Sequence, residues 1–183
     1  MMTRRQAVML APLGLAVAAG GGFYAMLRGM SKGSFDPRAT GNPLLNHPVP
    51  DFALPAQPPS SGFGSADLRA ASGPVLVNFF ASWCVPCLVE HPQLMELGKN
   101  VPIWGIAYKD AADKVDNLLN RDGNPYARVA RDAPGRVAID FGITGVPETF
   151  LVSAGVIRWH FPGPLTPEVV DSRLRPALQA AAA

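Results

Sequence analysis

From Gly73 onward, short apolar runs alternate with stretches of helical period. An apolar run of four to eight residues bounded by turn residues is typical of a buried strand. The predicted strands cover residues 75–80, 103–107, 128–131, 149–152 and 156–160. The predicted helices cover residues 84–98, 111–120, a turn at 137–141 and a last helix from 167 to about 180. Strands that alternate with helices and end in a hairpin plus a helix indicate an α/β fold, with a central mixed sheet flanked by helices.

The segment before this pattern is irregular. Residues 29–59 are rich in Pro, Gly, Ser and Asn, and only residues 52–54 resemble a strand. A short helical turn is expected at residues 65–68. We therefore predict a linker at residues 29–48 and one folded domain at residues 49–183.

The N-terminal segment has a different composition. Residues 7–27 form a 21-residue uncharged stretch, with arginines on both sides. As a helix this stretch would span roughly 32 Å, close to the ~30 Å hydrocarbon core of a bilayer. Residues 1–28 are therefore predicted to be a signal anchor, with Arg4 and Arg5 on the cytoplasmic side. The alternative is a cleaved signal peptide with its small-residue site at residues 16–18. Both interpretations export the domain.

Composition and charge exclude several classes of protein. Apolar residues make up 48% of the 183 residues, which suffices for a core without disulfide support. The net charge of +2 is too small and too scattered to predict a nucleic-acid partner. Much of it comes from Arg4, Arg5, Arg28 and Lys32, which favours a membrane as the partner instead.

The chain has two cysteines, Cys84 and Cys87, at the start of a predicted helix. Side chains one helical turn apart lie about 5–6 Å apart, a separation at which a disulfide can open and close without large backbone movement. The helix N-terminus favours a negative sulfur, so we expect Cys84 to be the exposed nucleophile and Cys87 the shielded, resolving thiol. Pro86 fits the first helical turn, where its missing N–H costs little.

Other interpretations of the pair are weaker. Two cysteines cannot make a four-cysteine zinc site, and the three histidines lack the paired spacing of a mixed site. A c-type haem attachment needs a histidine where this chain has Leu88. A structural disulfide that closes so short a loop would add little stability. A peroxiredoxin-like site would have a threonine where Ser82 or Ala81 stands.

At this point the residues resemble a known superfamily. The sequence WCVPC at residues 83–87 resembles the thioredoxin active site, and Pro92 and the pair Val146–Pro147 extend the match. The sequence GITGVPETF at residues 142–150 is similar to the signature of CcmG/DsbE-type proteins. The resemblance implies a thioredoxin-like fold, a cis peptide bond between Val146 and Pro147, and no cofactor.

The same resemblance implies a biological setting. It places a single-pass protein in the bacterial inner membrane, with its domain in the periplasm. There it would reduce a disulfide of apocytochrome c, or of a cytochrome c maturation thiol protein, before haem attachment. The periplasm is oxidising, so a membrane thiol-reductase is expected as the electron donor.

One departure from thioredoxin concerns proton transfer. Thioredoxin has a buried aspartate six residues before its first cysteine, where this chain has Asn78. An amide cannot take a proton from Cys87, so Glu90 or Glu148 is the candidate acid. The alternative is that both glutamates are solvated surface residues.

Other candidate residues surround the pair. Trp83 is expected to shield the site and offer an apolar docking surface, with plain packing as the alternative. Tyr108 ends a predicted strand on the side where open α/β sheets place their sites, and is assigned to a partner-facing loop. Val146, Pro147 and Glu148 complete the predicted partner surface. A general exported oxidoreductase and a non-enzymatic docking module remain alternative functions.

Overall fold

The computed structural model describes residues 4–31, 42–58 and 60–182, except the side chains of residues 4–11, 13, 15, 29–31 and 182. The chain divides into two compact units, residues 1–40 and 41–183. The first unit holds helix α1 (Arg4–Ser31). Among the residues that the structure fully describes, no helix is both long and apolar enough to cross a membrane. The span predicted at residues 7–27 and the part of the predicted linker at 29–41 lie partly outside those residues and stay predictions.

The second unit contains the predicted alternation of strands and helices. The strands are β1 (Val75–Phe80), β2 (Ile103–Tyr108), β3 (Arg128–Asp132), β4 (Glu148–Ser153) and β5 (Val156–Pro162). The helices are α2 (Ser65–Ala70), α3 (Val85–Leu97), α4 (Ala112–Asp122), α5 (Arg136–Asp140), α6 (Pro167–Val169), one π-helical turn η1 (Val170–Leu174) and α7 (Arg175–Ala182). These bounds confirm the predicted elements to within about two residues.

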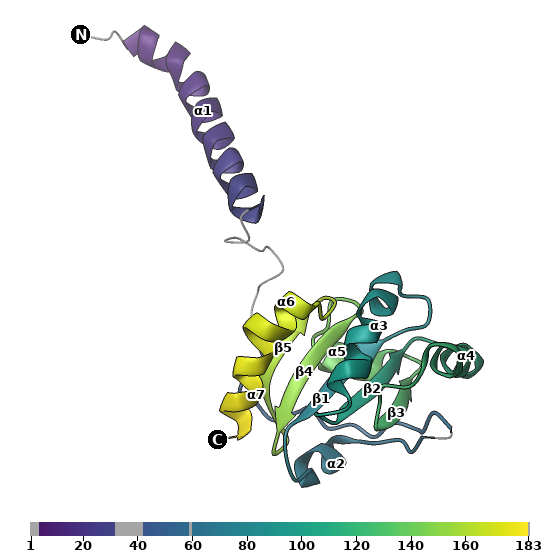
Figure 1. Ribbon diagram of the computed structural model, residues 1–183. Coiled ribbons are helices and arrows are strands. Elements are labelled where there is room, and N and C mark those ends of the chain that lie inside the picture. Colours follow the sequence, from purple (N-terminus) through teal and green to yellow (C-terminus); the bar gives the residue numbers. More distant parts are fainter. Residues whose placement is uncertain (1–3, 32–41, 59, 183) are drawn as a thin grey trace. The chain divides into compact units, whose positions relative to one another are not determined.

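The five strands form one mixed sheet in the order β3-β2-β1-β4-β5 (Figure 1). Strand β1 pairs parallel with β2, and β2 parallel with β3. Strand β4 runs antiparallel to both β1 and β5. The predicted thioredoxin-like arrangement, a mixed sheet flanked by helices, is confirmed, and β1 lies at its centre.

Side chains of β1 divide between two hydrophobic cores because successive residues of a strand point to opposite faces. Leu76 and Phe80 belong to the core that also contains residues of α3, α4 and the C-terminal helices. Val77 and Phe79 belong to the core on the other face, which α2 and α5 cover. The alternation places Asn78 on the α3 face, where all its surface is buried.

Residues 42–48 belong to the compact unit rather than to the linker. The Asn42 side chain donates to the Phe141 carbonyl at 2.9 Å, and the Asn46 N–H donates to Ile157 O at 2.7 Å. The domain therefore starts before residue 49, the boundary that the composition suggested. The strand-like piece at residues 52–54 makes only an isolated bridge, from Ala53 to Gly64.

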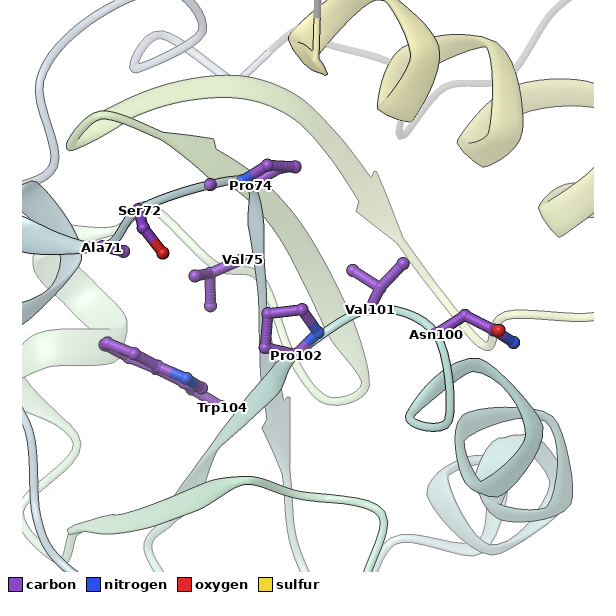
Figure 2. Close-up of a pocket in the computed structure, with 9 residues that line it drawn as sticks. Ala71, Ser72, Pro74, Val75, Asn100, Val101, Pro102 and Trp104 are labelled. Carbon is purple, nitrogen blue, oxygen red and sulfur yellow. The ribbon is translucent and has the colours of Figure 1, made fainter.

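A pocket of about 450 Å³ lies at the amino ends of β1 and β2 (Figure 2). Pro74 and Val75 line one side, and Pro102 and Trp104 the other. The cysteines follow the carboxyl end of β1, so this pocket lies at the opposite end of the sheet from them.

Candidate active site

Cys84 and Cys87 form a disulfide at the amino end of α3, with their Cα atoms 5.3 Å apart. Cys84 is the N-cap residue of the helix, and its Sγ accepts the Cys87 N–H at 3.2 Å. Pro86 lies exposed in the first turn of α3, as its missing N–H predicts. The free N–H groups and the dipole at this end favour a thiolate on Cys84 over one further along the helix.

Burial does not distinguish the two cysteines. Cys84 is 4% exposed and Cys87 is 5% exposed in the disulfide form. The predicted contrast between an exposed and a shielded sulfur is therefore wrong for this state. The difference lies in their partners, because the Cys84 sulfur receives a helix N–H and faces a second loop.

That second loop contains the Val146–Pro147 peptide bond, which is cis as the resemblance implied. Cys84 Sγ lies 3.4 Å from the Val146 carbonyl oxygen, which can accept a hydrogen bond from the thiol in the reduced form. Pro147 itself is buried. Residues 62 positions apart in the sequence thus meet at the sulfur atom.

Glu148 holds this loop from within. One carboxylate oxygen accepts the Thr144 N–H at 2.7 Å, the Thr144 hydroxyl at 2.8 Å and the Gly145 N–H at 3.3 Å. The other lies 2.6 Å from His160 Nε2. Burial alone would raise the pKa of Glu148, but the hydrogen bonds from His160 and Thr144 outweigh it and lower the pKa below its ordinary value. The carboxylate is occupied by these partners, and the side chain is 3% exposed rather than solvated.

Glu90 lies on the inner face of α3, one turn after Cys87, and is 1% exposed. Its two carboxylate oxygens accept the Asn78 amide at 3.0 Å and the Leu165 N–H at 2.8 Å. Burial raises the pKa of Glu90 to about 7 from the ordinary 4.5, although these two hydrogen bonds oppose the change. A carboxyl group with a pKa near neutral can both take and release a proton under physiological conditions. The interpretation of Glu90 as a solvated surface residue is therefore wrong.

Asn78 is the centre of a buried polar network. Its amide nitrogen donates to Glu90 and to the Thr149 hydroxyl, each at 3.0 Å, and its carbonyl oxygen accepts from the Tyr126 hydroxyl at 2.9 Å. Strands β1 and β4, helix α3 and the segment before β3 each contribute one residue. At the position where thioredoxin has a buried aspartate, this protein thus has the neutral Asn78, which contacts the acid Glu90.

A small pocket leads from the surface towards Glu90. Its volume is about 170 Å³, and Glu90 is the one ionisable residue among those that line it. The other lining residues come from α3 and from the segment that leads into α6: Val89, Pro92, Gln93, Pro164, Leu165, Thr166 and Pro167. The site therefore has two approaches, one at the sulfur atoms and one at the carboxyl group.

The surface next to the disulfide is apolar. Trp83, Val85 and Val89 are 57%, 68% and 67% exposed. The Trp83 indole N–H donates to the Lys109 carbonyl at 3.3 Å, and its ring centroid lies 6.5 Å from that of Tyr108. Trp83 and Tyr108 therefore lie next to each other, and their role in docking a partner stays a prediction.

Asp110 fixes the segment that precedes Cys84. Its carboxylate accepts the Ser82 N–H at 2.5 Å and the Ser82 hydroxyl at 3.0 Å. The loop after β2 therefore positions the approach to the active-site helix.

Sequence reasoning missed several members of the site. Tyr126, Thr149, Leu165, His160 and Asp110 were not assigned to it, and their partners lie 12 to 75 positions away. The sequence did contain one indication of this network. Asn78 is a polar residue in an otherwise apolar strand, and a buried amide needs hydrogen-bond partners for its donors and its acceptor. Which residues serve as those partners depends on the fold.

Comparisons with known proteins agree with this geometry. The model of the Redoxin family matches residues 44–178. The chain is 38% identical over 162 residues to the thiol:disulfide interchange protein HelX of Rhodobacter capsulatus, covering 87% of this chain and 88% of that protein. It is 37% identical over 183 residues to a DsbE homolog of Paracoccus denitrificans, covering 100% and 99%.

A solved structure shows the same fold. A protein from Chlorobium tepidum, described as a thiol:disulfide interchange protein of the DsbE type, superposes with a TM-score of 0.61 at 24% identity, covering 73% of this chain and 94% of that one. The active-site pair Cys84–Cys87 makes the present protein a thiol:disulfide oxidoreductase. The chain belongs to the redoxin family, as a thiol:disulfide interchange protein of the DsbE/HelX type.

Proposed function

We propose that this protein is a membrane-anchored reductase of the bacterial periplasm, whose client is a disulfide of apocytochrome c or of a thiol protein that handles it before haem attachment. One observation supports the proposed roles of the two cysteines. The Cys84 sulfur accepts a helix N–H and faces the Val146–Pro147 loop, which favours Cys84 as the attacking group. The setting rests on the DsbE/HelX relationship.

The reaction exchanges one disulfide for another. The Cys84 thiolate attacks a client sulfur, forms a mixed disulfide and releases the first client thiolate, which takes up a proton. Cys87 then loses its proton and attacks Cys84 Sγ, which closes the Cys84–Cys87 disulfide and releases the second client thiol. Two electrons and two protons pass to the client, and the protein is left oxidised.

Glu90 is the proposed acceptor of the Cys87 proton. The two residues lie three positions apart on α3, a spacing that brings side chains together on one helix face. A pKa of about 7 at Glu90 is matched to this transfer. The proton then reaches solvent through the small pocket beside Pro92 and Thr166. Glu148 serves instead to hold the loop that carries Val146, because the hydrogen bonds from His160 and Thr144 lower its pKa and keep it ionised.

The client is proposed to dock on the apolar surface of Trp83, Val85 and Val89, beside Tyr108. Apolar and aromatic side chains of this kind are enriched at the buried core of protein interfaces. The predicted anchor at residues 7–27 would keep the domain beside a membrane thiol-reductase at high effective concentration, and so keep the pair reduced.

The direct test is to trap the client. In Cys87→Ser the resolving thiol is missing, so Cys84 should accumulate a mixed disulfide that non-reducing electrophoresis and mass spectrometry identify. The matched control Cys84→Ser keeps one thiol on the same helix and should trap little. Apocytochrome c or a haem-handling thiol protein in the adduct supports the proposal. Adducts with unrelated exported proteins would point to a general oxidoreductase.

The direction of electron flow has its own test. Alkylation of intact cells before lysis should find Cys84 and Cys87 mostly reduced. A fully oxidised pair at steady state would reverse the assignment from reductant to oxidant. Cytochrome c maturation that persists in a Cys84→Ser, Cys87→Ser double variant without added thiols would identify a docking module in place of an enzyme.

A further inference from the structure

The orientation of the Asn78 amide decides what Glu90 faces. An ionised carboxylate only accepts hydrogen bonds, so the NH₂ end of the amide has to point towards it. In the structure this end contacts Glu90 and Thr149, and the carbonyl end contacts Tyr126. A rotation of the amide by half a turn would instead place an oxygen against the carboxylate, which disfavours the charged form.

Tyr126 supplies the group that opposes this rotation. Its side chain is buried, so its O–H proton needs an acceptor inside the protein, and the Asn78 carbonyl oxygen is that acceptor. With the amide rotated, two donors would face each other. Burial, and then the negative charge of Glu90, hold the pKa of Tyr126 well above its ordinary value, so the hydroxyl keeps its proton.

Packing fixes the place of that hydroxyl. The Tyr126 ring stacks on Phe80 with centroids 4.6 Å apart and an interplanar angle of 25°. Gly105 of β2 lies beneath both rings, since a Cβ there would come within 2.9 Å of each. The ring therefore has one position, and the hydroxyl is held at the end of it.

We infer that Tyr126 is a positioning residue of the redox reaction: its hydroxyl locks the Asn78 amide with NH₂ towards Glu90, and so keeps the carboxyl group ready to accept a proton. The importance of this arrangement for the reaction rests on the proposed function of Glu90 as the proton acceptor. The Tyr126 hydroxyl donates to Asn78, and Asn78 in turn donates to Glu90, so Tyr126 acts through Asn78.

The groups around Glu90 allow a clean measurement. The segment before β3 contributes Tyr126, and α3 itself contributes the cysteine pair, which does not titrate as a disulfide. Strands β1 and β4 contribute the neutral Asn78 and Thr149, and the segment before α6 contributes a backbone N–H. In the oxidised protein, a proton taken up at this site is therefore assigned to Glu90.

The test is a titration of the full-length oxidised chain labelled with ¹³C at the glutamate side-chain carboxyls. The sequence has four glutamates, so the spectrum is simple, and Glu90→Gln assigns the signal. In Tyr126→Phe the ring stack remains and only the hydroxyl is lost. We expect the Glu90 titration to move to higher pH by about 0.5 to 1 pH unit, because the amide no longer has to present its NH₂ group.

Tyr108→Phe is the matched control, because it removes a tyrosine hydroxyl that makes none of the hydrogen bonds of Asn78. It should leave the Glu90 titration within about 0.2 pH unit of wild type. An unchanged Glu90 signal in Tyr126→Phe, or an equal change in Tyr108→Phe, would overturn the inference. These results do not depend on a client, so they are separable from failure of the trapping experiment that tests the proposed function.

If either variant fails to fold, a second measurement on the wild-type protein tests the same inference. The two carboxamide protons of Asn78 should exchange slowly with solvent, because each is held by its own buried acceptor. Rapid exchange of these protons with solvent would show that the NH₂ group is not held between Glu90 and Thr149, and would contradict the inference.

Discussion

At the scale of single residues, the carboxyl group of Glu90 is under two opposing influences. Burial favours its neutral form, and the two N–H groups that it accepts favour its charged form. Burial is the larger influence, so the pKa in the folded protein lies above the value in the unfolded chain. This difference links the acid to the stability of the whole domain.

The sign of that linkage gives a prediction for Glu90→Gln. Between about pH 4.5 and 7 the folded wild type binds more protons than the unfolded chain, so its stability falls as the pH rises through this window. At 1.36 kcal/mol per pH unit the loss is on the order of 3 kcal/mol, and Glu90→Gln should not show it. Urea denaturation of the oxidised protein at a series of pH values measures this.

Glu96→Gln is the control for that series, because Glu96 is exposed on the same helix and pairs with Lys99. Its stability curve should run parallel to wild type. If the Glu90→Gln curve also runs parallel to wild type, Glu90 has no raised pKa in the folded protein, and its role as proton acceptor is not supported.

At the scale of elements, the cis-proline loop depends on the carboxylate beneath it. In Glu148→Gln the amide can still accept from Thr144, but its NH₂ group replaces the oxygen that faces His160. We expect a loss of about 1–3 kcal/mol in unfolding free energy at pH 7 and slower mixed-disulfide formation at Cys84. Since the pKa of Glu148 is lowered in the fold, this stabilisation is present above about pH 4.5 and is lost as the pH falls through the folded value.

The difference between wild type and Glu148→Gln should accordingly shrink in acid. Asp140→Asn is a suitable control, since Asp140 is exposed at the end of α5 close to the same loop in sequence. A Glu148→Gln protein with wild-type stability at pH 7 would show that the loop holds its shape without the charge.

Strand β2 passes so close to the Phe80–Tyr126 stack that it has no room for a side chain at residue 105. In Gly105→Ala the new Cβ would lie 2.9 Å from each ring, so we expect a destabilisation of about 1–3 kcal/mol from overpacking. Gly73→Ala is the control, because no atom lies within 4 Å of the Cβ position there. Thermal unfolding of both variants measures the difference, and equal melting temperatures would contradict it.

At the scale of the whole molecule, the boundary of the folded unit can be tested by truncation. A chain that starts at residue 42 should fold cooperatively with the redox pair intact. A chain that starts at residue 49 loses the hydrogen bonds of Asn42 and Asn46, and should be less stable by about 1–3 kcal/mol. Equal denaturation midpoints for the two would show that residues 42–48 are dispensable.

Much of this fold was predictable because its strands have clear apolar runs and its cysteines follow one of them. Local sequence predicted the cysteine pair and the helix that begins at it. The resemblance to thioredoxin-like proteins predicted the cis-proline loop. The surroundings of Glu90 were not predictable, because Leu165 and Asn78 reach it from 75 and 12 positions away. The equal burial of Cys84 and Cys87 was missed because exposure at a helix end depends on the loop packed against it, here at Val146.

The dispersed origin of the Glu90 partners limits how this active site can be transplanted. The helix from Cys84 to Leu97 could be grafted into another protein of the same fold with its sequence unchanged. The graft would carry the disulfide and its N-terminal dipole, but not Asn78, Tyr126 or the Leu165 N–H. The carboxyl group of Glu90 would then be buried in another protein without the two N–H groups that donate to it here. Such a chimera would keep the ability to form a disulfide and lose control over when the second thiol reacts.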